Sequence, residues 1–189
     1  MKIRNILIAI LAIMSISGTT AFAQTPDDEK KILVAYYSLR NGNTRLVAEE
    51  IQKKVGGEIF RIETVNAYPA QYNDVTTQAK KELESGHRPA LSTSVQNFDQ
   101  YDIIYLGSAN WWGTIAPAVM TFLESNNFES KTIIPFITHE GSRMGNSVED
   151  IKELAPKATV LKGLPIRGGS AANAGADVER WLKELGQTK

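Results

Sequence analysis

The pattern of hydrophobic and polar positions divides most of the chain into alternating strand-like and helix-like segments. Three continuous apolar runs are rich in β-branched and aromatic residues and short enough to be buried strands: residues 31–38, 101–108 and 131–138. Residues 58–63 alternate between apolar and polar positions, which predicts a half-buried strand. Residues 158–166 predict a last, broken strand.

Apolar residues at helical spacing predict a helix after each strand. They lie at Val47, Ile51 and Val55, at Val75, Ala79 and Leu83, at Ile115, Val119 and Phe122, within residues 146–156, and at Val178, Trp181, Leu182 and Leu185. Five strands alternating with five helices predict an α/β fold, with a parallel sheet covered on both faces. Because crossovers are right-handed, we expect a doubly wound open sheet in one domain, residues 31–186.

The first 23 residues have a different pattern. Lys2 and Arg4 precede the apolar run 6–16, and small residues precede Gln24. This layout predicts a secretory signal peptide, residues 1–23, that is cleaved near Ala23/Gln24 to release a periplasmic or secreted protein. The alternative is an uncleaved anchor, but the apolar run is shorter than the ~20 residues of a spanning helix. We therefore expect no stable membrane span after cleavage.

Composition excludes several kinds of chemistry. The chain has 189 residues, no cysteine and two histidines, so disulfides, thiolate metal sites, a cysteine nucleophile and a multi-histidine metal site are not expected. Removing Lys2 and Arg4 from the 21 basic residues leaves 19 against 21 acidic residues, a net charge of −2. This balance indicates neither nucleic acid nor an anionic membrane as a partner.

Three loops with unusual content follow the central buried strands. They comprise residues 38–44, 107–114 and 138–147. In an open α/β sheet, ligands bind beyond the carboxyl ends of the strands. Because parallel strands place these ends at one edge, we expect the three loops to converge there.

The first loop supplies hydrogen-bond donors just before a helix that has no acidic residue in its first turn. Helix N-termini favour negative charge, yet this turn carries Arg40 and Arg45. Gly42 permits the positive φ of a tight turn, which directs backbone N–H groups at one anion. We interpret the loop as a phosphate site with side-chain donors from Ser38, Asn41, Asn43 and Thr44. The alternative is a well-capped helix with two solvated arginines.

The second and third loops suggest contacts with a flat ring. Trp111 and Trp112 are adjacent, so both cannot face the core, and an exposed indole favours a covering aromatic ligand. The alternative is packing against neighbouring loops or a second subunit, which leaves a homodimer open. The third loop has two glycines around Ser142 and Arg143, giving donor-rich backbone. His139 and Glu140 fit either ligand contacts or ordinary loop positions.

These pieces together resemble the flavodoxin-like FMN-binding family, especially its bacterial branch with a GNT phosphate loop and a WWGT second loop. The matching segments are residues 41–51, 101–119, 138–156 and 158–163, and the likeness covers residues 31–185. The resemblance implies a flavodoxin-like five-stranded parallel sheet of order 2-1-3-4-5, with helices on both faces. It also implies FMN as the cofactor.

The resemblance assigns FMN-contacting positions in each loop. The phosphate would be held by Ser38, Asn41, Gly42, Asn43 and Thr44; the isoalloxazine would lie along Ser108, Ala109, Asn110, Trp111, Trp112 and Gly113; and its pyrimidine edge would contact Thr138, His139, Glu140, Gly141 and Ser142. Three features differ from typical flavodoxins. The first loop is one residue longer, residues 108–112 (SANWW) contain no glycine, and the charge is close to neutral.

The resulting expectation is an exported FMN protein that moves electrons. It is either an electron carrier or a reductase for a quinone-like acceptor, and its redox partners are a nicotinamide, a quinone or a redox protein. The flavin supplies the chemistry, so no catalytic side chain is assigned. The alternative is a binding protein that keeps the fold but has lost FMN and any redox role. A phosphoacceptor receiver domain is disfavoured because the first strand ends in Tyr37 and Ser38 rather than in aspartates.

Overall fold

The computed structural model describes residues 30–39 and 42–187. The expected signal peptide, and Arg40 and Asn41 of the expected phosphate loop, lie outside the described residues. None of the helices in the described ranges is long and apolar enough to cross a membrane.

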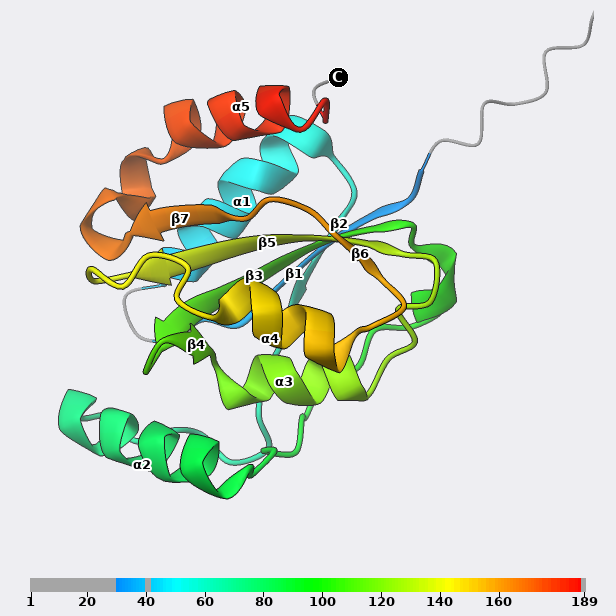
Figure 1. The fold of residues 1–189 in the computed structure, drawn as a ribbon. Coiled ribbons are helices and arrows are strands. Elements are labelled where there is room, and N and C mark those ends of the chain that lie inside the picture. The colour runs from blue at the N-terminus through cyan, green and yellow to red at the C-terminus, as the bar shows by residue number, and fades with distance from the viewer. Residues whose placement is uncertain (1–29, 40–41, 188–189) are drawn as a thin grey trace, which may run out of the picture.

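A parallel sheet forms the centre of the molecule (Figure 1). Its strands are β1 (Ile32–Tyr36), β2 (Glu58–Arg61), β3 (Ile103–Trp111), β5 (Thr132–His139), β6 (Thr159–Val160) and β7 (Leu164–Arg167), and a short β4 (Thr114–Ile115) pairs antiparallel with β3. The order is β2-β1-β3-β5-β6, and β7 also pairs with β5. Because β6 and β7 are two halves of the expected broken strand, the predicted order 2-1-3-4-5 is confirmed.

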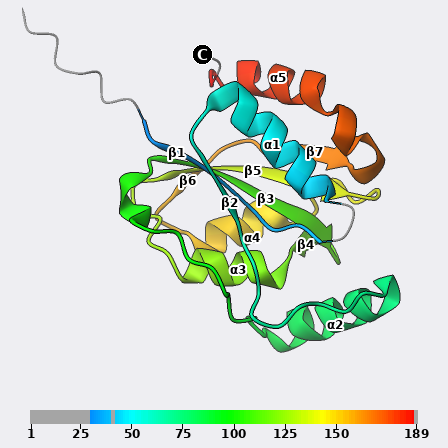
Figure 2. The same ribbon diagram turned by 180° about the vertical axis from the view of Figure 1, so that it is seen from behind.

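Helices cover both faces of the sheet. They are α1 (Asn43–Val55), α2 (Tyr72–Ser85), α3 (Pro117–Glu124), α4 (Ser147–Leu154) and α5 (Gly175–Glu184), with short 3₁₀ helices η1 (Phe98–Gln100) and η2 (Gly168–Asn173). Figures 1 and 2 show α1 and α5 on one face and α3 and α4 on the other. The helix expected around Ile115 begins later, because Ile115 pairs with Asn110 in β4 and Pro117 starts α3.

Two apolar clusters, one on each face, hold these layers together. Val47 of α1 and Val178 of α5 are fully buried on one face, and Val119 of α3 and Ile151 of α4 on the other. The central strand β3 is buried over its first six residues. The edge strand β2 is more exposed than its sequence pattern predicts, because it pairs only with β1.

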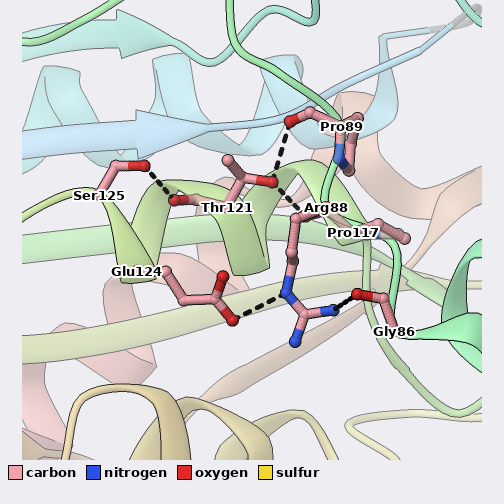
Figure 3. Close-up of polar contacts among 7 residues, drawn as sticks. All are labelled: Gly86, Arg88, Pro89, Pro117, Thr121, Glu124 and Ser125. Carbon is pink, nitrogen blue, oxygen red and sulfur yellow. Dashed lines mark hydrogen bonds and ion pairs between the residues drawn. The ribbon is translucent and has the colours of Figure 1, made fainter.

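The helix α2 lies beyond α3, and its first half projects past the carboxyl edge of the sheet (Figure 1). The segment after α2 is fastened to α3 by two side chains (Figure 3). The Arg88 guanidinium donates to Glu124 Oε1 at 2.8 Å, and the Thr121 hydroxyl is 3.0 Å from the Pro89 carbonyl. The far end of α2 is therefore fixed to the body of the protein, while its first half forms a wall beside the sheet edge.

Gly107 gives the first testable prediction. It lies in the middle of β3, where an added Cβ would overlap the Phe136 ring of the neighbouring strand. We expect Gly107→Ala to lower the free energy of unfolding by about 1–3 kcal/mol, the usual cost of overpacking a core. Urea unfolding measures this change. Gly169→Ala is the matched control, because a Cβ there meets open space. An equal effect of both substitutions would show that the Phe136 contact does not restrict this position.

Candidate functional site

A cavity of about 740 Å³ lies at the carboxyl edge of the sheet. The three expected loop segments converge on it, as the sequence predicted, but the second was wrongly predicted as a loop: residues 107–111 belong to β3, and a two-residue turn joins them to β4. Most of the expected site residues line it: Ser38, Asn43, Thr44, Ala109, Asn110, Trp111, Trp112, Gly113, Thr138, His139, Glu140, Gly141 and Ser142. A volume of this size is typical of small-molecule and cofactor sites.

Two expected residues, Gly42 and Ser108, do not line the cavity in the described structure. Asn41 lies outside the described residues. Gly42 is the N-cap of α1, with φ of 70°, and its carbonyl accepts from the Leu46 N–H at 2.9 Å. Ser108 is fully buried within β3, and its hydroxyl has a structural role. Its hydroxyl accepts from the Ala116 N–H at 2.9 Å and donates to the Ala109 carbonyl at 2.8 Å.

One end of the cavity is formed by the N-terminus of α1. The first turn contains no acidic residue. The buried hydroxyls of Thr44 and Thr138 are 2.8 Å apart and tie this turn to β5. Arg45 forms an ion pair with Glu49 at 2.6 Å on the surface, so its charge is balanced without a ligand, as the capped-helix alternative expects. An anion site here is indicated by the N-terminus of α1, which no acidic residue compensates and which lies beside two hydroxyls, and not by Arg45.

The two adjacent tryptophans point in different directions. Trp111 packs edge-on against Tyr37 and Tyr68, with ring centroids 5.8 and 5.1 Å away. Trp112 has a φ of 52° and is 60% exposed at the cavity. Its indole N–H donates to the Thr76 carbonyl of α2 at 3.0 Å. The sequence-based expectation that one indole stands at the surface is therefore confirmed, and that indole bridges the second loop and α2.

The second and third loops form one connected unit. The Asn110 side chain accepts from the Gly113 N–H at 3.0 Å and donates to the Arg143 carbonyl at 3.2 Å. The Asn146 N–H donates to the Gly113 carbonyl at 2.7 Å. A Cβ on Gly145 would overlap the same Gly113 carbonyl. These contacts fix the aromatic wall of the cavity (Trp111 and Trp112) in position relative to its polar rim (the third loop).

The polar rim of the cavity carries charges of both signs. His139 Nδ1 is buried and has no hydrogen-bond partner among the described residues. Burial lowers the pKa of His139, and the nearby Arg143 and Arg167 lower it further, while Glu140 acts in the opposite direction. A Cβ on Gly168 would meet both the Glu140 carboxylate and Asn43 Nδ2, so these polar groups approach the same glycine.

Several cavity residues were not predicted from the sequence. They are Tyr37, Leu39, Tyr72, Val75, Thr76, Ala79 and Gly168. Val75 and Ala79 were interpreted as a core-facing helical stripe, and an apolar stripe gives the same pattern whether it covers a core or a ligand cavity. Gly168 and Gly169 directly follow the last strand, and this glycine pair at the carboxyl edge was an available signal.

The arrangement suits a ligand with an anionic end and a flat ring. The uncompensated helix end and the threonine hydroxyls match an anion, the tryptophans match a ring, and the rim offers polar groups to the ring edge. No group of three or more histidine, cysteine, aspartate or glutamate side chains that could hold a metal ion occurs in residues 30–39 and 42–187.

Comparisons with known proteins agree with this architecture. The sequence model of the flavodoxin family matches residues 31–185. A solved structure from Bacteroides uniformis, provisionally named a flavoprotein, is 31% identical and has a TM-score of 0.72; the alignment covers 82% of this chain and 98% of that one. A similarly named protein from Bacteroides eggerthii is 28% identical over the same shares, with a TM-score of 0.73.

A more distant flavoprotein from Lactobacillus acidophilus, solved in complex with FMN, shares the fold. It is 24% identical, with a TM-score of 0.63 over 78% of this chain and 99% of that chain. No curated protein matches the sequence.

The environment of His139 predicts its titration. Because burial and two arginines disfavour the imidazolium, we expect His139 to titrate below the usual histidine pKa of about 6.5. Arg143→Gln and Arg167→Gln should each raise that pKa. The same shift makes the free energy of unfolding decrease as the pH falls through the unfolded-state value.

An NMR titration of the imidazole signals measures this pKa, and a His87→Gln variant assigns the two histidines. Arg180→Gln on α5 removes an equal charge that is not among the groups acting on His139 and should leave its pKa unchanged. If the pKa of His139 is the same in the Arg143 and Arg167 variants as in the unsubstituted protein, the described position of the arginines is contradicted.

Proposed function

Since the chain belongs to the flavodoxin family, we propose that it binds FMN in the cavity at the carboxyl edge and transfers electrons through it. The single observation that supports this most strongly is the geometry of that cavity. One end has a helix N-terminus without an acidic residue, and the other has an exposed indole. The FMN complex of a flavoprotein with the same fold supports the choice of ligand.

The residues of the cavity fit the three parts of FMN. Asn43 and Thr44 at the start of α1 would hold the phosphate, with Thr138 supporting Thr44 from β5. The aromatic wall of Trp111 and Trp112 would cover the ring and exclude water. The third loop would offer backbone donors to the ring's polar edge.

The bound flavin would supply the redox chemistry, and the chain would set its electrostatics. The groups near the rim that carry positive charge or an N–H are His139, Arg143 and Arg167. They outnumber the single carboxylate there, that of Glu140. Nearby positive charge favours negative charge on a bound group. This balance favours reduction by two electrons, as in a reductase for a quinone-like acceptor, over a one-electron carrier. A reductive titration separates the two, because a carrier would show two resolved steps.

The alternative is a binding protein that has kept the fold but lost FMN. A yellow purified protein with a flavin absorption spectrum supports the redox function. A protein that stays colourless and does not bind added FMN would favour the alternative.

The phosphate end of the cavity gives a quantitative prediction. Thr44→Ala and Asn43→Ala should each weaken FMN binding by roughly 10- to 100-fold, because each removes a hydrogen bond to a charged group worth about 1.5–3 kcal/mol. Riboflavin, which lacks the phosphate, should bind both variants nearly as well as the unsubstituted protein. Quenching of flavin fluorescence measures both affinities.

The control for this prediction is Thr44→Ser, which keeps the hydroxyl and should restore most of the FMN affinity. If FMN and riboflavin lose affinity equally in the alanine variants, these side chains do not bind the phosphate.

We further propose that the protein is exported and acts in the periplasm or outside the cell, with residues 1–23 removed. The positive start, apolar run and small residues before Gln24 support this proposal. Full-length protein expressed in a bacterial host should be recovered from the periplasm or medium with a mature N-terminus near Gln24. Replacing Ala21 and Ala23 with bulky residues should retain the precursor. N-terminal sequencing of an uncleaved chain would contradict the proposal.

A further inference from the structure

Two arginines beside the cavity differ from the other described arginines. Arg45, Arg61, Arg88 and Arg180 each form an ion pair with a carboxylate, at distances between 2.6 and 3.4 Å. Arg143 and Arg167 are exposed and form no ion pair with any described residue. Both lie at the carboxyl edge of the sheet, since Arg167 ends β7 and Arg143 is in the loop after β5.

Arg143 and Arg167 do not line the cavity themselves, but each is next in sequence to a residue that does, Ser142 and Gly168. Arg167 ends β7 and is the direct partner of His139 on β5, so the two side chains leave the same face of the sheet. Arg143 lies in the loop after β5, and its carbonyl is held by Asn110. His139 itself lines the cavity, and both arginines act on its pKa.

The backbone at Arg143 has an unusual conformation for a residue with a side chain. Its φ is 54°, a left-handed conformation that costs energy for any residue with a Cβ but not for glycine. The same loop uses glycine at Gly145, where φ is 52°. A strained non-glycine residue at a cavity edge is a typical sign of a functional side chain.

We propose that Arg143 and Arg167 form an anion-binding rim that recruits a small planar organic anion to the cavity. Guanidinium groups bind carboxylate, sulfonate and phosphate oxygens through paired hydrogen bonds. The exposed Trp112 offers a ring face at the same cavity, which suits an aromatic anion. The proposed ligand is a small molecule rather than an acidic protein, because the two arginines flank a cavity of about 740 Å³, the size of a small-molecule site.

The role of this ligand as an electron partner rests on the proposed FMN function, but its binding does not. We therefore test binding to the oxidised mature protein, in which no electron transfer occurs. The probes are anthraquinone-2-sulfonate and its neutral analogue 2-(hydroxymethyl)anthraquinone, and their dissociation constants are measured by calorimetry or tryptophan quenching at low and high salt.

We expect the sulfonate to bind more tightly than the neutral analogue, and its advantage to shrink as salt rises. Arg143→Gln and Arg167→Gln should each weaken sulfonate binding by about 5-fold, as is usual for an exposed charge pair, and leave the neutral probe unchanged. Arg180→Gln is the matched control and should affect neither probe. Arg143→Lys, which keeps the charge, should retain much of the preference.

The proposal of an anion-binding rim would be contradicted if the two probes bind equally, or if the three glutamine substitutions have equal effects. Absorption of bound FMN is recorded in the same samples. A protein that does not bind added FMN but still prefers the sulfonate would refute the proposed function and support the anion-binding rim. A yellow protein without this preference would support the proposed function and refute the rim.

Discussion

The parallel pairing of β1, β3 and β5 is the constraint on which the rest of the structure depends. Tyr36 pairs with Gly107, which in turn pairs with Phe136, so the three strands run side by side through the core. Because the strands are parallel, the loops that leave them must emerge at one edge. The cavity is therefore a product of strand direction, and its chemistry is a product of what each loop carries.

The order of the sheet and the position of the three loops could be predicted from the sequence, because long apolar runs and helical stripes are strong signals. Prediction was less successful where one sequence pattern is compatible with two structural roles. The stripe of Val75 and Ala79 gave no indication that α2 forms a cavity wall. Ser108 is polar, yet it lies inside β3, where its buried hydroxyl accepts from the Ala116 N–H. The pairing of Arg167 with His139 depends on the register of β7, which periodicity alone does not give.

The two sides of the cavity are held in different ways. The loop side continues from paired strands and is fixed to the core. The α2 side is held by side chains: Val75 and Ala79 are buried, and hydrogen bonds join Trp112 to Thr76 and Tyr68 to Glu82. The width of the cavity therefore depends on the side-chain packing of α2, while the positions of the polar groups depend on the sheet.

The bridge made by Asn110 has a consequence for protein engineering. The carbonyl of Gly113 is approached closely by Gly145 and accepts from Asn146, while Asn110 contacts both loops. If one of these loops were replaced by that of a relative, its length and its hydrogen-bond partner for the Asn110 amide would differ. The other loop would then lose the contacts that hold it. Chimeras with a new aromatic wall would thus need residues 109–114 and 140–146 transplanted as a pair.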